Sequence, residues 1–311
     1  MYKSFGLIEQ HFHGVFGIDF SNCSVNDFVD VSVEILKYGI TRIYPTLMTD
    51  DLGKIKSQIS KIKKAKEIQP VQSAKISGIH LEGPFINPEK SGIHNPEFIL
   101  TPSIENYSKI EDDFIKIVTV APEFDTGLCQ YLKQKGVKVS AGHTTASDLS
   151  GCDCATHLFN AMSGITHKAE NTVTSALVND DLFVEVIADG NHIIPAVLDL
   201  IFRAKPHDKI ILISDALPCT YADKSEFVFA GQKVFYKNGA FYNSEGILGG
   251  SGMLVSEIIK KLVNTRKFSL SPETLLKMAS KNILKYLNVE NNGFVYFDEN
   301  LNVIKTELLP K

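Results

Sequence analysis

The sequence has few of the features that mark membrane, secreted or nucleic-acid-binding proteins. Its longest apolar runs have the length of a strand, and none approaches the roughly 20 residues of a membrane span. The N-terminal residues, MYKSFGLIEQHFHG, lack the apolar core of a signal peptide. The net charge is −4, and lysine and arginine are spread along the chain. We therefore expect neither nucleic acid nor a membrane surface as a partner.

Cysteine is also scarce, with five residues in a chain of 311. An odd count in a chain of this length favours reduced thiols, and hence a cytoplasmic protein, over a disulfide framework. Cys152 and Cys154 could form a soft-metal pair, but no second pair completes a zinc knuckle. We interpret them as two small residues in a turn between a helix and a strand.

Apolar β-type runs alternate with amphipathic helical runs along the whole chain. This alternation is typical of βα units that build a parallel sheet. The predicted strands are residues 5–11, 40–47, 76–81, 115–120, 137–141, 155–159, 183–188 and 210–214. Eight parallel strands are the number that closes a barrel, so the predicted fold class is α/β, a (β/α)8 TIM barrel of the metal-dependent hydrolase type. The main predicted helices are residues 24–38, 50–67, 125–136, 195–204, 253–264 and 271–287.

The chain departs from this rhythm in two places. Glu226–Leu248 alternates with period two around Asn238-Gly239, a strong signal for a type I′ hairpin, and we interpret it as an insertion in the last crossover. Gly293–Leu309 is typical of a further hairpin. We predict a barrel domain over residues 1–287 and a C-terminal β-hairpin tail over residues 288–311.

Metal-competent side chains occur where the predicted strands end. They are His11, His13, Glu82, His143, His157 and Asp215. Functional residues of a parallel barrel collect at this end of the strands, so we expect these side chains to converge. Mixed imidazole and carboxylate ligands suit Zn²⁺, Fe²⁺, Co²⁺ or Mn²⁺ and disfavour Mg²⁺ or Ca²⁺. Glu82 could bridge two ions about 3.5–4 Å apart.

Each of these residues also has a simpler explanation. The two histidines of His-x-His could lie on an exposed strand, and the other histidines could cap a turn or pack in the core. Glu82 could accept hydrogen bonds from a turn, and Asp215 could be an N-cap. All of these explanations would have to hold together, so the set favours a metal site more strongly than any member does.

Such a site points to hydrolysis. A bound metal lowers the pKa of its water from about 15.7 toward 7, and so makes hydroxide available at neutral pH. An aspartate beside that water can take its proton and pass it to a leaving amine, and Asp215 is the candidate for this role. The expected reaction class is metal-assisted hydrolysis of an amide or a related C–N bond.

The sequence resembles the amidohydrolase superfamily and, within it, the N-acetylglucosamine-6-phosphate deacetylase family. The resemblance covers roughly Gly6 to Leu287. Its phrases run in the family's order: HFHGVFGIDF, GITRIYPTLMT, GIHLEGPFINPEKSGIHNPEFI, VTVAPE, VSAGHT, ATHLFNAM, ADGNHIIP, ILISDALP and FAGQKVFYKNGAFYNSEGILGGSGM. The most specific motifs are LEGPF followed by KxGxH, and THLFNAM, whereas His-x-His alone is common.

The resemblance implies a metal role for each ligand. The tighter ion would be held by Glu82, His143 and His157. A second ion, which some members lack, would be held by His11, His13, Glu82 and Asp215. Asp215 would also be the catalytic acid and base. Zinc is the expected metal, with iron, cobalt or manganese as alternatives and one or two ions per subunit.

The resemblance also implies substrate contacts. His94 would contact the N-acetyl group or the sugar and help to polarise the carbonyl, and His192 would touch the sugar. The backbone at Asn160 and Ala161 would meet the phosphate. A surface position is the alternative for either histidine, and a structural Asx turn is the alternative for Asn160.

Two departures from the family pattern stand out. The family usually has Arg-Glu-Pro-Gly shortly after THLFNAM, with an arginine that binds phosphate, often across a dimer interface. Here the stretch is THKAEN, and Lys168 takes the arginine's place as a point charge without the bidentate fork. The family also has a small β domain, which we expect to be absent here or reduced to Gly293–Leu309. The resemblance implies a homodimer.

The expected function is removal of the acetyl group from N-acetylglucosamine 6-phosphate, a phosphorylated amino sugar. Two alternatives remain open. The first is an amidohydrolase that deacetylates a different N-acetyl sugar or cleaves another amide, which the Lys168 replacement favours. The second is an inactive relative that serves as a binding subunit. Such relatives tend to lose ligands or the aspartate, and all six residues are present here.

Overall fold

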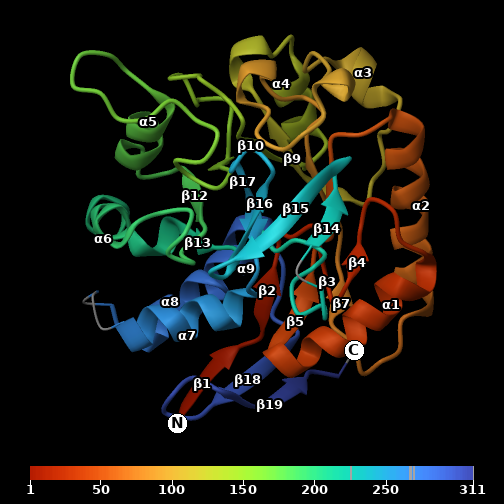
Figure 1. The fold of residues 1–311 in the computed structure, drawn as a ribbon, viewed down its shortest axis with the longest axis vertical. Helices are drawn as coiled ribbons and strands as arrows, with labels where there is room; N and C mark the ends of the chain where they lie inside the picture. Colours follow the sequence, from red (N-terminus) through yellow and green to blue (C-terminus); the bar gives the residue numbers. More distant parts are fainter. Residues whose placement is uncertain (225, 266–267, 269, 311) are drawn as a thin grey trace.

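The computed structural model describes residues 1–224, 226–265, 268 and 270–310. In this part of the chain the parallel strands form two curled sheets with helices around them (Figure 1). The smaller sheet contains, in spatial order, β2 (Leu7–Glu9), β5 (Ile40–Ile43) and β7 (Lys75–Ile76). The larger contains β13 (Ile210–Leu212), β12 (Phe183–Val186), β11 (Cys154–Ala155), β10 (Lys138–Ala141), β9 (Ile115–Val120), β8 (Ile79–Glu82) and β6 (Thr46–Met48). The fold is α/β with a curled parallel sheet.

Two predicted strands are each divided between these sheets. Residues 40–47 form β5 and β6, and residues 76–81 form parts of β7 and β8. Pro45 lies between β5 and β6 and has no N–H for a ladder hydrogen bond, which explains the first division. Gly78 lies between β7 and β8, where an added Cβ would be 2.3 Å from the Lys116 side chain.

The ends of the two sheets approach each other just after β2 and β13. The Asp215 amide donates to the His11 carbonyl at 3.0 Å, and the His13 amide donates to the Ala216 carbonyl at 2.8 Å. Within the described ranges, β2 and β13 do not pair as a ladder. These two hydrogen bonds bring the end of strand one beside the end of strand eight.

Strand alternation places the large hydrophobic core on one face of the curled sheets, and polar side chains together with a second apolar cluster on the other. Leu81 and Val118 belong to the large hydrophobic core, and side chains in a strand alternate between the two faces of a sheet. Their neighbours His80 and Thr119, and Glu185 on β12, are fully or almost fully buried on the other side. The interior of the curled sheet therefore contains buried polar side chains that need partners from other strands, beside an apolar cluster that includes Ile8 and Ile117.

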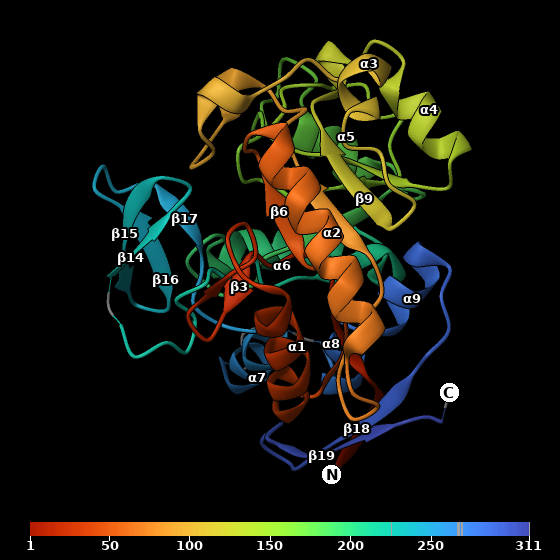
Figure 2. The ribbon, with the colours of Figure 1, turned by 90° about the vertical axis from the view of Figure 1, so that its right-hand side faces the viewer.

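Helices pack around the sheets, and Figure 2 shows α2 crossing the outside of the molecule. The α-helices of the described residues are α1 (Val25–Glu34), α2 (Leu52–Ile68), α3 (Ile104–Ser108), α4 (Leu128–Gln134), α5 (Thr172–Val178), α6 (Pro195–Ala204), α7 (Val255–Thr265), α8 (Pro272–Met278) and α9 (Lys281–Leu287). The predicted single helix 271–287 is wrong in one respect, because it breaks between α8 and α9. At the break, the Ala279 carbonyl accepts a hydrogen bond from the Ile8 amide on β2 at 3.0 Å.

The predicted hairpin insertion forms a separate antiparallel sheet, which stands at one side of the molecule in Figure 2. Its strands are β14 (Glu226–Phe229), β15 (Gln232–Lys237), β16 (Ala240–Asn243) and β17 (Leu248–Ser251). Asn238 and Gly239 have φ angles of 53° and 90°, as a type I′ turn requires. A bridge between Ala216 and Ser251 joins the insertion to the end of strand eight.

A third small sheet lies near both chain ends (Figure 1). In it β1 (Tyr2–Phe5) pairs with β18 (Gly293–Phe297), which pairs with β19 (Val303–Leu308). The predicted tail hairpin is thus joined by a strand from the N-terminus, and residue 311 of that prediction lies outside the described residues. The remaining short antiparallel pair is β3 (Gly14–Val15) with β4 (Ile18–Asp19).

Two further predictions concern cysteines and membrane spans. All five cysteines are buried and free, including Cys152 and Cys154. Among the described residues, no helix is both long enough and apolar enough to cross a membrane.

Candidate metal centre

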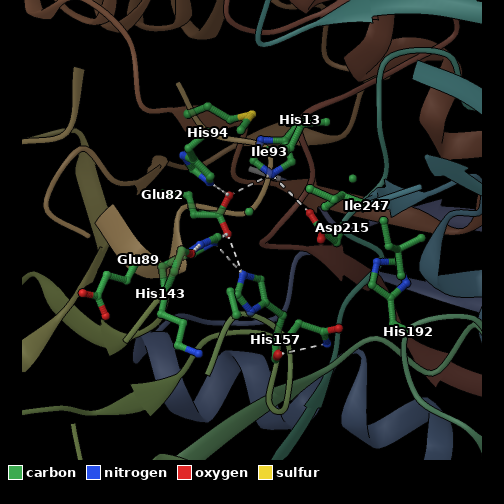
Figure 3. Close-up of a pocket in the computed structure, with 17 residues that line it drawn as sticks. His13, Glu82, Glu89, Ile93, His94, His143, His157, His192, Asp215 and Ile247 are labelled. Atoms are coloured by element: carbon green, nitrogen blue, oxygen red, sulfur yellow. Dashed lines mark hydrogen bonds and ion pairs between the residues drawn. The ribbon is translucent and has the colours of Figure 1, made fainter. Parts of the chain in front are cut away.

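A cavity of about 340 Å³ opens where the parallel strands end (Figure 3). Its volume lies in the range of small-molecule sites. Glu82 at the end of β8 lines its floor, together with histidines from the loops that follow β10 and β11. Ile247 and Leu248 of the insertion also line it. The cavity therefore lies between the strand ends and the inserted sheet.

One oxygen of Glu82 is surrounded by imidazole nitrogens. Glu82 Oε1 is 2.9 Å from His157 Nε2, and 3.3 Å from both His143 Nε2 and His11 Nε2. The nitrogens of His143 and His157 are themselves 3.1 Å apart. Glu82, His143 and His157 thus form a compact set of three buried ligands.

The other oxygen of Glu82 faces a second set. Glu82 Oε2 is 3.1 Å from His13 Nε2 and 3.3 Å from His94 Nε2. Asp215 Oδ1 approaches the same region, at 3.2 Å from His13 Nε2 and 3.5 Å from His11 Nε2. In Figure 3, Glu82 lies between His94 and His13 on one side and His143 and His157 on the other.

The donor chemistry of these groups fits a divalent cation. His143 Nδ1 lies 2.7 Å from the Lys90 carbonyl, which can only accept, so Nδ1 carries the proton. The lone pair of neutral His143 is then on Nε2, facing Glu82 and His157. His11 Nε2 is buried and makes no hydrogen bond within the described residues, although two carboxylate oxygens lie near it. Lone pairs that converge in this way need a cation between them, and the set suits Zn²⁺, Fe²⁺, Co²⁺ or Mn²⁺.

The pKa values of the metal-free protein reflect the same convergence. Burial disfavours the charged form of His13, but hydrogen bonds with Asp215 and Glu82 outweigh it and raise the pKa of His13 to about 9. Burial also acts to raise the pKa of Asp215 and Glu82, yet nearby His11, with hydrogen bonds from His13, holds both pKa values well below the ordinary range. Both carboxylates are therefore ionised and available as ligands.

His94 differs from His13 in its charge state. Burial lowers the pKa of His94 to about 4, and the nearby His143 imidazole acts in the same direction. His94 Nδ1 lies 2.8 Å from the Thr49 hydroxyl, and its Nε2 faces Glu82. The ring is neutral near pH 7 and is fixed within the cluster.

The backbone at this site adopts unusual conformations. His143, His157 and Asp215 have φ angles of 49°, 30° and 51°, in the left-handed region that costs a residue with a Cβ about 1–2 kcal/mol. These conformations end the strands early, so the predicted strand 155–159 is reduced to β11, and His157 lies two residues beyond it. Strain of this kind is typical of functional sites.

The structure brings together the six residues that were singled out as metal ligands. Their side chains lie within 3.5 Å of a neighbour in the cluster. His94, expected as a substrate contact, lies inside the cluster beside Glu82.

Of the other predicted substrate contacts, three line the cavity and one does not. Asn160, Ala161 and His192 are part of its wall. The side-chain amide of Asn160 donates to the His157 carbonyl at 3.1 Å, a local structural contact that differs from the Asx turn given as the alternative. Lys168 is exposed and is not among the residues that line the cavity. Lys90, from the KSGIH motif, is a cation that does line it.

Sequence reasoning missed the polar groups beneath the cluster. Glu185 Oε2 is 2.9 Å from His11 Nδ1, and Gln10 Nε2 donates to Glu185 Oε1 at 2.6 Å. His80 packs edge-on against His11, with ring centroids 4.6 Å apart. The sequence signal for these groups was the glutamate within the apolar strand FVEV. A carboxylate buried there has no solvent around it and needs hydrogen-bond partners from the protein.

Comparisons with known proteins are consistent with this geometry. No protein-family model matches the sequence. The N-acetylglucosamine-6-phosphate deacetylase of Bacillus subtilis is 32% identical over 299 residues, which cover 91% of this chain and 75% of that enzyme. The N-acetylgalactosamine-6-phosphate deacetylase of Escherichia coli O157:H7 is 26% identical and covers 91% of this chain and 77% of its own length.

A solved deacetylase structure is also similar to this chain over nearly its whole length. The crystal structure of N-acetylglucosamine-6-phosphate deacetylase from Pasteurella multocida superposes with a TM-score of 0.90 at 28% identity, over 98% of this chain and 85% of that chain. Identity at this level over most of both chains, together with the shared fold, shows that the protein belongs to the N-acetylglucosamine-6-phosphate deacetylase family.

Proposed function

We propose that the protein is a divalent-metal-dependent hydrolase that converts N-acetylglucosamine 6-phosphate and water into glucosamine 6-phosphate and acetate, in amino-sugar catabolism. The observation that carries this proposal is the convergence of five imidazoles on Glu82, with Asp215 beside two of them, in a chain of this family.

Two overlapping ligand sets support binding of one or two ions. The first set is Glu82, His143 and His157. The second set is His11, His13, Glu82 and Asp215. A divalent cation held there supplies Lewis acidity and lowers the pKa of water so that hydroxide is available near neutral pH. Zinc suits these nitrogen and oxygen ligands, and iron, cobalt and manganese are the alternatives.

Asp215 is the proposed acid and base. Its carboxylate is ionised and lies at the edge of the cluster, so it can take a proton from the attacking water. The oxygen of that water forms a bond to the acetyl carbon, and the C–N bond breaks as Asp215 returns the proton to the amine nitrogen. Neutral His94 faces the same space and is placed to help polarise the acetyl carbonyl.

The cavity wall supplies the proposed contacts with the sugar. His192 is oriented by Asp189, whose Oδ2 lies 2.9 Å from His192 Nδ1, and would contact the sugar ring. The backbone at Asn160 and Ala161 would meet the phosphate, with Lys168 as its counter-charge.

Acetate release tests the function directly. We expect turnover of N-acetylglucosamine 6-phosphate by metal-loaded enzyme, and a large loss of it in Asp215→Asn. Wild-type turnover by that variant would contradict the mechanism. Equal kcat/KM for the sugar with and without its 6-phosphate would contradict the phosphate assignment and leave the deacetylase chemistry in place.

A second candidate substrate is N-acetylgalactosamine 6-phosphate, because the E. coli relative is named for that sugar. The two substrates differ in configuration at one carbon. The ratio of kcat/KM for the two sugars decides between them. An inactive binding subunit is the remaining alternative, and a protein that takes up no metal would support it.

Further proposals concern the architecture. We propose that the parallel strands close into a complete (β/α)8 barrel over residues 1–287, which the hydrogen bonds between the ends of strands one and eight support. Residues 288–311 would correspond to part of the family's small β domain. We also propose a cytoplasmic homodimer, and sedimentation velocity tests its mass.

A further inference from the structure

We propose that Glu185 is a positioning residue that fixes His11 for the second ion, and that this buried carboxylate decides whether the enzyme holds one ion or two. The proposal rests on the assignment of His11 as a metal ligand in the proposed function.

The contact between Glu185 and His11 defines which nitrogen of the ring carries the proton. Glu185 Oε2 lies 2.9 Å from His11 Nδ1, and both side chains are shielded from solvent. An ionised carboxylate only accepts hydrogen bonds, so His11 Nδ1 must donate. The lone pair of a neutral ring is then on Nε2, which faces Glu82 Oε1 at 3.3 Å and Asp215 Oδ1 at 3.5 Å. The carboxylate thus directs the metal-binding nitrogen of His11 toward the second ligand set.

Glu185 is itself held in place from two directions. Gln10, the residue before His11, donates from Nε2 to Glu185 Oε1 at 2.6 Å. The backbone of Glu185 lies within β12, where its carbonyl accepts from the Leu158 amide at 2.8 Å. Each carboxylate oxygen therefore has one donor, and the chain segment beneath is anchored in the sheet.

His80 completes the support and does not form a further metal site. His11, His80 and Glu185 are close enough together to hold an ion. However, His80 Nδ1 donates to the Gln10 carbonyl at 3.2 Å, and the Thr119 hydroxyl lies 2.8 Å from His80 Nε2. Both nitrogens of His80 are engaged, so no lone pair is left for an ion. The ring instead packs edge-on against His11 and limits its rotation.

The first ion has a different kind of support. His143 Nδ1 donates to the Lys90 carbonyl, which is a neutral acceptor, whereas His11 donates to an anion. A carboxylate partner raises the basicity of a ligating imidazole, and loss of such a partner typically weakens metal affinity about 10- to 100-fold. Removal of the charge of Glu185 should therefore weaken the second ion selectively.

The experiment measures zinc binding by wild type and Glu185→Gln, with metal-to-protein ratios at graded free zinc set by a chelator buffer. Wild type should take up two equivalents. Glu185→Gln keeps the shape of the side chain and should bind the first ion as wild type does, with the second ion about 10- to 100-fold weaker. Melting temperatures of the metal-free proteins show whether the fold is retained.

Asp189→Asn is the matched control. Asp189 also lies 2.9 Å from an imidazole Nδ1, that of His192, but His192 makes no contact with Glu82 among those the structure records. This variant loses the same kind of carboxylate–histidine contact and should still bind two ions. If it loses the second ion as Glu185→Gln does, the effect is not specific to His11 and the proposal is wrong.

Three other results would overturn the proposal. They are a wild-type second-ion affinity in Glu185→Gln, equal weakening of both ions, and a wild type that saturates with one ion. Acetate release by wild type is measured alongside, so a one-ion enzyme that is active would reject this inference and keep the proposed function. If Glu185→Gln does not fold, Glu185→Asp retains the charge at a greater distance from His11 and should still weaken only the second ion.

Discussion

The two ligand sets around Glu82 are held in place by different means. In the first set, His143 and His157 lie in loops after their strands and have left-handed backbone conformations, and the Lys90 carbonyl in another loop orients His143. In the second set, His11 also lies two residues beyond its strand, β2, but it is oriented by the buried side chain of Glu185. Asp215 of the second set shares the left-handed backbone, so the difference lies in the orienting partner, which is a backbone carbonyl for His143 and a side-chain network inside the sheet for His11.

The largest effect is expected where the two sets meet. Glu82 belongs to both sets, with Oε1 near His157 and His11 and Oε2 near His13, so Glu82→Gln should lose both ions and nearly all turnover, about 10⁴-fold or more, since metal assistance is worth several kcal/mol. Metal content and acetate release measure this. Asp199→Asn, which removes a surface contact with Arg203, is the control and should retain both ions. A Glu82→Gln protein that keeps two ions would show that the sets do not share this ligand.

Asp215→Asn separates the sets, because Asp215 belongs to the second one only. The proposed acid and base is lost, and kcat should fall by about 10²- to 10⁴-fold. The first ion should remain, since Glu82, His143 and His157 are unchanged. Metal analysis and kcat from the same preparation test this, and loss of the first ion would contradict the separation of the two sets.

The second set also predicts a pH dependence of the metal-free protein. The pKa of His13 is raised from 6.5 to about 9 by its carboxylate neighbours, against the effect of burial. A raised pKa contributes stability that is complete below about pH 6.5 and is lost as the pH rises through about 9. This shift corresponds to about 3 kcal/mol.

Chelator-treated protein should therefore have a smaller free energy of unfolding at pH 9.5 than at pH 6. Zinc-loaded protein should show a much smaller change, because an ion replaces the proton on His13. Urea unfolding at both pH values, with chelator and with zinc, measures the difference. Equal pH profiles in the two states would show that His13 does not exchange a proton for an ion.

The smallest expected effect is on metal affinity when Gly92 is changed, in the loop that orients His143 of the first set. Gly92 has a φ of 59°, and an added Cβ would lie 3.5 Å from His143 Cε1. Gly92→Ala should cost about 1–2 kcal/mol of backbone strain, which the loop can relieve by shifting away from His143. We expect the affinity for the first ion to fall by about tenfold and that for the second to change little. Gly136→Ala, with a φ of 74° and no atom within 4 Å, introduces similar backbone strain without the contact and should leave both affinities unchanged.

Much of the fold and the convergence of the candidate ligands could be predicted because both depend on local rules. Apolar runs located the eight predicted strands at least in part, although residues 155–159 share only Ala155 with β11, and the ends of these runs located His11, Glu82 and Asp215. The type I′ turn at Asn238-Gly239 was visible for the same reason, since two residues determine its conformation.

The rest depends on contacts between distant segments. Glu185 and His11 are 174 residues apart, and no local pattern links them. The left-handed conformations at His143 and His157 are imposed by the surrounding loops rather than by the residue type. The role proposed for Lys168 concerns an exposed loop outside this cavity, so it stays a prediction.

The buried polar side chains inside the curled sheet have a consequence for how the centre is assembled. Hydrogen bonds beneath the centre link Ser140, Thr156, Thr119 and His80 to the backbone carbonyl of Gln10. The side chain of Gln10 continues the network to Glu185 and His11. These side chains lose their conformational freedom when the protein folds. His11, a proposed ligand, is therefore already ordered in the folded protein before any ion binds. The entropic cost of ordering its side chain opposes folding and does not weaken metal binding.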